Sequence, residues 1–191
     1  MSYDVVREFE RALAEYAGAR YCVTTSSCSA ALTIACALYA PTTVSFPRHT
    51  YCSAPMAALH AGHRISWRDE DWRGAYRLEP TTIWDSARRF RAGMYVAGQM
   101  QCVSFQASKI LGLEQGGAIF HDSEKADIEL RRLRFDGRYD ESEGLPQRLG
   151  FHCYMSPTVA ALGLQRLALL PRDNPDQVVH FPDLSALPIW P

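Results

Sequence analysis

Residues 104–120 read SFQASKILGLEQGGAIF and combine a strand end, a lysine and a glycine pair in one short stretch. Lys109 follows the predicted strand after a short turn, and Gly116-Gly117 introduces the next one. Among the 20 basic residues only two are lysines, and Lys125 falls in a charged segment that predicts a solvated helix. A lysine in a dry pocket has a lowered pKa and can act as a nucleophile, so Lys109 is the candidate of interest.

On both sides of this stretch, short apolar strands alternate with helices. The pattern predicts helices at 4–17, 30–40, 51–60, 122–134 and 157–169, and strands at 21–25, 43–46, 64–67, 82–84, 102–105 and 118–120. Residues 68–80 are predicted to form a loop. This alternation indicates an α/β fold with a mostly parallel sheet flanked by helices.

In such sheets, ligands bind at the carboxyl ends of the strands. Three polar groups are expected there: the turn Ser26–Ser29, Asp85, and the segment Ser104–Lys109. The turn precedes an apolar helix, whose backbone N–H groups could bind an anion or could simply be capped. Asp85 could be a metal ligand, a general base, a partner for a cationic ring, or a cap.

The composition and net charge of the sequence argue against several classes of function. The 191 residues carry a formal net charge of −1, which argues against a nucleic-acid or membrane surface that would need a basic stripe. No apolar run approaches the roughly 20 residues of a membrane-spanning helix. With no apolar signal core at the start, we expect a cytoplasmic protein with its six cysteines reduced. No cysteine pair has zinc-site spacing, so no metal is expected; a His60–His63 site and a nucleophilic Cys28 are weaker alternatives.

Five segments, in order, resemble the DegT/DnrJ/EryC1/StrS sugar aminotransferases, which have the type I fold of enzymes that use pyridoxal 5'-phosphate. FERALAEYAGARYCVTTSSCSAAL resembles their first helix, strand and phosphate turn, and HTYCSAPMAALHAG their TY-x-A-T segment. WDSARRF resembles an EDAAQ-like segment, and SFQASKILGLEQGGAIF an SF-x-x-x-K…GEGG signature. LGFHCYMSPTVAALGLQRL resembles a G-x-N-x-R-M…AA-x-G-x-QL segment.

The resemblance implies a role for each matching residue. Lys109 takes the place of the Schiff-base lysine, and Asp85 that of the aspartate paired with the pyridine nitrogen. Tyr51 matches the aromatic residue that stacks on the ring. The phosphate would be held by Cys28, Ser29 and Ser104. The implied reaction moves an amino group from glutamate or glutamine to a nucleotide-linked keto-sugar, in a homodimer with a shared active site.

Several residues depart from the family pattern. Arg88 stands where a glutamine approaches the phenolic oxygen of the cofactor, so it would stabilise that oxygen or bind a substrate phosphate. His152 replaces the asparagine that reaches the neighbour's phosphate. Relative to the family, we expect a strand–helix unit to be missing between Arg77 and Thr82, and the small carboxyl-terminal domain to be missing beyond residue 170. We expect one cofactor-binding domain at 1–170 and a Pro-rich extended tail at 171–191. The alternative is a non-catalytic module that binds the cofactor or a nucleotide and regulates a partner.

Overall fold

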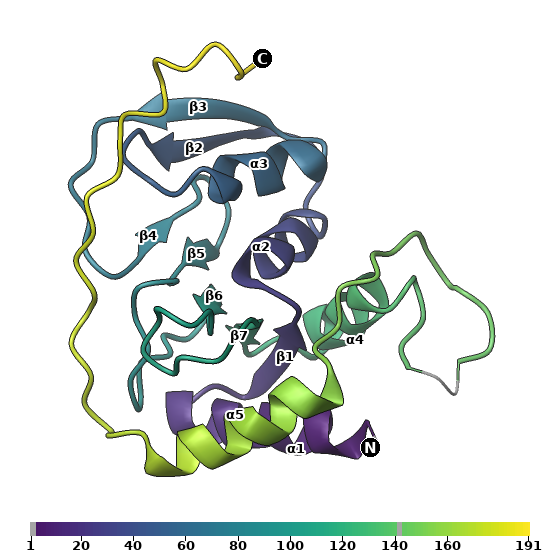
Figure 1. Cartoon of the computed structure of the whole chain (residues 1–191). Coiled ribbons are helices and arrows are strands. Elements are labelled where there is room, and N and C mark those ends of the chain that lie inside the picture. Colours follow the sequence, from purple (N-terminus) through teal and green to yellow (C-terminus); the bar gives the residue numbers. More distant parts are fainter. Residues whose placement is uncertain (1–2, 141–142) are drawn as a thin grey trace.

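The computed structural model describes residues 3–140 and 143–191 (Figure 1). The helices are α1 (Asp4–Ala17), α2 (Cys28–Cys36), α3 (Ser53–His60), α4 (Glu124–Arg134) and α5 (Pro157–Leu169). The strands are β1 (Tyr21–Thr25), β2 (Thr43–Pro47), β3 (Arg64–Arg68), β4 (Tyr76–Arg77), β5 (Ile83–Asp85), β6 (Met100–Ser104) and β7 (Gly117–His121). The α/β class and most elements are as predicted, but β4 lies in the segment that was predicted to be a loop. Within the described residues no helix has the length and apolar character needed to cross a bilayer.

The strand directions correct one expectation, because the main sheet is not mostly parallel. Its order is β1-β7-β6-β5-β4, and only β5 and β6 pair in parallel. Parallel neighbours need a crossover of a dozen or more residues, usually a helix. The connection from β4 to β5 is residues 78–82, which is long enough only for a reversal. The connection from β6 to β7 contains no helix, and it returns the chain antiparallel.

Despite these reversals, the strands that carry the predicted polar groups point the same way. Both β1 and β6 are antiparallel to β7, and β5 is parallel to β6. Their carboxyl ends, at Thr25, Asp85 and Ser104, therefore lie at one edge of the sheet. The parallel pair β2–β3 extends the layer, because Ser45 N donates to the carbonyl oxygen of Glu79 at 2.8 Å.

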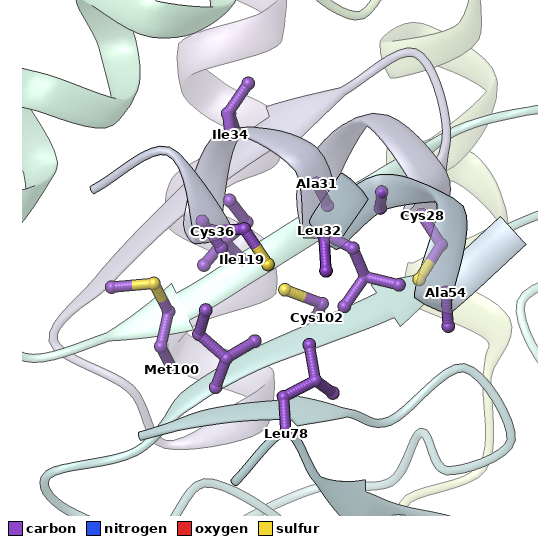
Figure 2. Packing of buried hydrophobic residues seen from close by; sticks show 14 of the residues in the cluster. Cys28, Ala31, Leu32, Ile34, Cys36, Ala54, Leu78, Met100, Cys102 and Ile119 are labelled. Carbon is purple, nitrogen blue, oxygen red and sulfur yellow. The ribbon is translucent and has the colours of Figure 1, made fainter. Parts of the chain in front are cut away.

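The sheet is buried between two helical layers because its side chains alternate between the two faces. On one face, Cys102 and Ile119 pack in a cluster with α2 and α3, and Figure 2 shows Leu32 and Cys36 of α2 in the same cluster. On the other face, Val103 and Phe120 pack in a second cluster with α1 and α5. Both faces of the central strands are thus covered, and only the strand ends are available to a ligand.

A buried ion cluster ties α1, β1 and α4 together. The Glu10 carboxylate accepts from Thr24 N at 2.8 Å and from Arg131 Nη1 at 2.7 Å, and it also pairs with Arg134. Arg134 is only 2% exposed. The charged sequence of this segment predicts a solvated helix, and that prediction is wrong for Arg134, whose charge is neutralised inside the fold.

The tail, residues 171–191, contains no helix or strand and runs beside the sheet from the end of α5 to β3 (Figure 1). Its backbone is tied down at intervals. Arg172 O accepts from Ala92 N at 2.8 Å, and Leu184 N donates to Arg48 O at 2.9 Å. Near its end, the Trp190 ring packs edge-on against Trp67 at 5.3 Å between centroids. The tail is therefore held along its length by the rest of the chain.

Candidate active site

A cavity of about 430 Å³ opens at the carboxyl ends of β1, β5 and β6. Its volume lies within the range of sites for small molecules and cofactors. Seven of the eight predicted site residues line it: Cys28, Ser29, Tyr51, Asp85, Arg88, Ser104 and Lys109. The topology therefore brings together, from four separate segments, the side chains that the sequence singled out.

His152 is the exception, because it does not line this cavity. Its side chain is 68% exposed, and Nδ1 lies 2.7 Å from Asp136 Oδ2. The sequence places its role in the site of a neighbouring subunit, so this residue stays a prediction about a dimer.

The turn Ser26–Ser29 is shaped for an anion at the start of α2. Ser27 is the N-cap, and its Oγ accepts from Ala30 N at 3.1 Å. Thr25 Oγ1 donates to Ser27 O at 2.8 Å, which fixes the turn from the strand side. The helix dipole and the first backbone N–H groups of α2 favour negative charge at this point. Capping and anion binding are therefore compatible, because the cap uses only one of the free N–H groups.

Gly117 of β7 lets the sheet approach this turn. A Cβ at position 117 would lie 2.5 Å from Cys28 N and 2.6 Å from Ser27 C, which are both backbone atoms that cannot simply swing aside. We expect Gly117→Ala to lower the free energy of unfolding by about 1–3 kcal/mol. It should also weaken anion binding at the turn by roughly tenfold or more, because the N–H groups move. Denaturant titration measures the loss of stability, and the binding of a phosphate-containing ligand measures the weaker anion binding.

Gly144→Ala is the matched control, because nothing lies within 4 Å of a Cβ at that position. If Gly117→Ala bound ligands as tightly as Gly144→Ala, the turn would not hold the anion.

Asp85 ends β5 and is buried beside the cavity. Its Oδ1 accepts from Ala87 N at 3.0 Å, and its Oδ2 accepts from the Tyr76 hydroxyl at 2.8 Å. Thr50 Oγ1 in turn donates to the Tyr76 hydroxyl at 2.7 Å. Burial raises the pKa of Asp85 above its ordinary value, and the two hydrogen bonds oppose part of that rise. These hydrogen bonds fix the orientation of the Asp85 carboxyl group, and a nearby cation would stabilise its charged form.

Lys109 is half-buried and follows a tight turn in which its backbone N donates to Gln106 O at 2.8 Å. Burial lowers the pKa of its amine, the positive charge of Arg88 lowers it further, and Asp85 opposes part of that change. Lys109 and Asp85 therefore lie within electrostatic reach across one cavity. A lowered pKa increases the neutral, nucleophilic fraction of the amine at neutral pH.

Arg88 also reaches the cavity. Its guanidinium lies over the Phe181 ring at 5.8 Å from the centroid. Among the described residues, none accepts a hydrogen bond from this guanidinium, and its buried Nε has no partner. Burial lowers the pKa of Arg88 somewhat, and Asp85 opposes the change.

The weaker alternatives lose support. Burial raises the pKa of Cys28 well above its ordinary value, so the thiol stays protonated and is a poor nucleophile. His63 is buried, with Nδ1 accepting from Thr42 N at 3.1 Å and Nε2 3.0 Å from Cys36 O. In the part of the chain that the structure describes, no three acidic, histidine or cysteine side chains gather as metal ligands would.

The residues at the site that the sequence did not single out include Thr50, Trp72, Tyr76 and Phe181. Trp72 and Tyr76 lie in the segment predicted as a loop, where a two-residue strand gives no periodic signal. Phe181 is a single aromatic residue in the tail. Its distance in sequence from the other site residues gave no indication that it would return to them.

The sequence matches the model of the DegT/DnrJ/EryC1/StrS aminotransferase family over residues 1–83 and 91–177. The unmatched residues 84–90 include Asp85 and Arg88, so the placement of these two rests on the geometry described above. No curated protein matches the sequence significantly.

Three solved structures illustrate the likeness of the fold. NtdA from Bacillus subtilis with bound cofactor PMP is 19% identical, with a TM-score of 0.75 over 87% of this chain and 48% of its own. A DegT DnrJ EryC1 StrS aminotransferase from Brucella abortus is 20% identical, with a TM-score of 0.71 over 86% and 58%. Helicobacter pylori PseC, an aminotransferase involved in the biosynthesis of pseudoaminic acid, is 16% identical, with a TM-score of 0.72 over 86% and 57%.

The chain thus spans about half to three-fifths of the length of these structures. Their fold is nevertheless reproduced over most of this chain, and the family model covers it from residue 1 to residue 177 with one short gap. This chain belongs to the DegT/DnrJ/EryC1/StrS aminotransferase family.

Proposed function

We propose that this chain binds pyridoxal 5'-phosphate in the cavity and transfers an amino group from glutamate or glutamine to a nucleotide-linked keto-sugar. The observation that carries the proposal is the presence of Lys109, Asp85 and the Ser26–Ser29 turn around one cavity, in a chain of an aminotransferase family. Each of the three has the chemistry that one part of this coenzyme requires: an amine for the aldehyde, a carboxylate for the ring nitrogen, and an anion site for the phosphate.

The residues fit the coenzyme on independent structural grounds. Gly117 lies so close to the backbone of the Ser26–Ser29 turn that a Cβ at position 117 would displace the turn. Such close approach of a glycine is typical of sites where backbone N–H groups bind an anion. Asp85 is a buried carboxyl group whose raised pKa a cation would lower. Tyr51 is 58% exposed and presents its ring at the cavity, available for stacking on a flat ring.

When bound, the coenzyme supplies an aldehyde carbon that carries the amino group and a cationic ring that withdraws electrons. Asp85 would hold the ring nitrogen in its protonated form through a charge-assisted hydrogen bond. Lys109 would hold the aldehyde carbon of the coenzyme and would act as the general base for the proton on the donor's α-carbon. The overall exchange converts an amino acid and a ketone into a 2-oxo acid and an amine.

The half-reaction tests the proposal. Purified protein should become yellow with pyridoxal phosphate, and added glutamate or glutamine should convert the coenzyme to its pyridoxamine form with release of 2-oxo acid. Retained colour without conversion would favour the non-catalytic binding module, and no coenzyme binding at all would reject the proposed aminotransferase. The oligomeric state, with a His152→Ala variant, tests the proposal of a homodimer that shares its active sites.

A further inference from the structure

The tail crosses the mouth of the cavity and is attached to both of its rims. On one rim, Gln177 donates from its backbone N to Arg88 O at 2.9 Å and from Nε2 to Ser108 O at 2.9 Å. On the other rim, His49 Nδ1 lies 3.1 Å from Phe181 O. Between these attachments, the Phe181 side chain turns inward and lines the cavity. Phe181 lies beyond residue 177, where the family match ends.

Phe181 is held in place by aromatic rings and a cation. Its ring stacks near Trp72, with centroids 6.1 Å apart and an interplanar angle of 15°, and lies 6.1 Å from the Tyr51 ring. The Arg88 guanidinium lies over the same ring. A cation–π contact of this kind positions a guanidinium while its N–H groups stay free to donate to a ligand.

The tail forms ion pairs with the side chains of the two nearby arginines but not with the side chain of Arg88. Arg89 and Arg91 both pair with Asp176, at 2.7 Å and 3.2 Å, and the Asp176 side chain is only 9% exposed. Arg88 is left without an acceptor. The charged side chains that line the cavity are Asp85, Arg88 and Lys109, which leaves one positive charge in excess. Under the proposed function, Asp85 and Lys109 are engaged by the coenzyme. Arg88, which the resemblance places either at the phenolic oxygen of the coenzyme or on a substrate phosphate, is the cavity cation whose buried Nε has no acceptor among the described residues.

We propose that Arg88 and Phe181 form a second anion subsite at the cavity mouth, in which Arg88 binds an oxyanion of the substrate and Phe181 positions Arg88. The ligand chemistry is a carboxylate or phosphate oxygen pair, which a planar guanidinium binds through two parallel N–H donors. Such a group is present on the amino donor as a carboxylate and on a nucleotide-linked sugar as a diphosphate. The assignment to a substrate rests on the proposed function, whereas the anion site itself does not.

Calorimetry on coenzyme-saturated and coenzyme-free protein tests the subsite with two probes, glutarate for the donor carboxylates and inorganic pyrophosphate for the diphosphate. We expect Arg88→Gln to weaken the preferred probe by roughly tenfold to a hundredfold, and Arg88→Lys to recover part of the loss. Phe181→Ala should weaken it by roughly threefold to tenfold, and Phe181→Tyr should restore it because the ring is kept. The probe that responds identifies the source of the anion.

Two controls separate this site from general effects. Arg64→Gln removes an exposed arginine on β3 with the same change in net charge, and Val178→Ala shortens an exposed tail residue. Both should bind the probes as the unmodified chain does. Because Arg88 lowers the pKa of Lys109, Arg88→Gln should also move the pH profile of coenzyme capture to higher pH, a change that a merely structural role of Arg88 would not produce.

Equal binding of the probes by Arg88→Gln and Arg64→Gln would overturn the proposal, as would failure of the unmodified chain to bind either probe. If the chain binds coenzyme but neither probe, the subsite is wrong and the proposed function stands. If it binds a probe through Arg88 but no coenzyme, the proposed function is wrong and the anion site stands.

Discussion

Lys109→Ala should lose all covalent attachment of pyridoxal phosphate and lower turnover by roughly a hundredfold to ten-thousandfold, the contribution usual for a positioned acid–base group. The half-buried amine with its lowered pKa is the one nucleophile suited to the aldehyde among the cavity residues. Borohydride reduction of the coenzyme-loaded protein, followed by peptide mass analysis, measures the attachment directly.

Lys125→Ala is the matched control, because Lys125 is the only other lysine in the sequence. It is exposed on α4, and Lys125→Ala should keep the coenzyme on the Lys109 peptide with turnover unchanged. A reduced adduct found on the amino terminus or on Lys125 in the unmodified chain would contradict the assignment of Lys109.

Asp85→Asn should change stability and catalysis in opposite directions. Without the carboxylate the ring nitrogen is less protonated, and turnover should fall by roughly a hundredfold or more while coenzyme binding weakens only modestly. Without coenzyme, the variant should unfold at a higher temperature at neutral pH, because a buried charge with a raised pKa destabilises the folded state. An asparagine can keep both hydrogen bonds, with its oxygen accepting from Ala87 and its amide donating to Tyr76.

The pH dependence of the stability difference between Asp85→Asn and the unmodified chain tests this second prediction. A carboxyl group whose folded pKa lies above its unfolded pKa adds stability at low pH and loses it as the pH rises through the folded value. The stability advantage of Asp85→Asn should therefore be present at neutral pH and shrink on acidification. Thermal unfolding at a series of pH values checks this, and bound coenzyme should reverse the difference. An advantage that was independent of pH would show that the Asp85 charge is not its cause.

The sequence was informative wherever a residue follows a regular element. Asp85 and Lys109 were found because each comes just after a predicted strand, and parallel directions of β1, β5 and β6 bring their ends together. The strand directions in the main sheet were missed because direction depends on the connections, and the turn of residues 78–82 joins β5 to β4, a strand that the sequence did not predict. Phe181 and Tyr76 were missed because their place in the site comes from tertiary contacts that leave no local pattern.

The register of the short β4–β5 hairpin determines which face of the sheet the Tyr76 side chain occupies. Tyr76 and Asp85 are direct partners across an antiparallel pair, so their side chains share a face, while Arg77 opposite Trp84 points to the other. A slip of the β4–β5 register by one residue would turn Tyr76 away and aim the neighbouring side chain at Asp85. Any change of length that keeps the Tyr76 hydroxyl on Asp85 must therefore be accommodated within the turn, with the strand register unchanged.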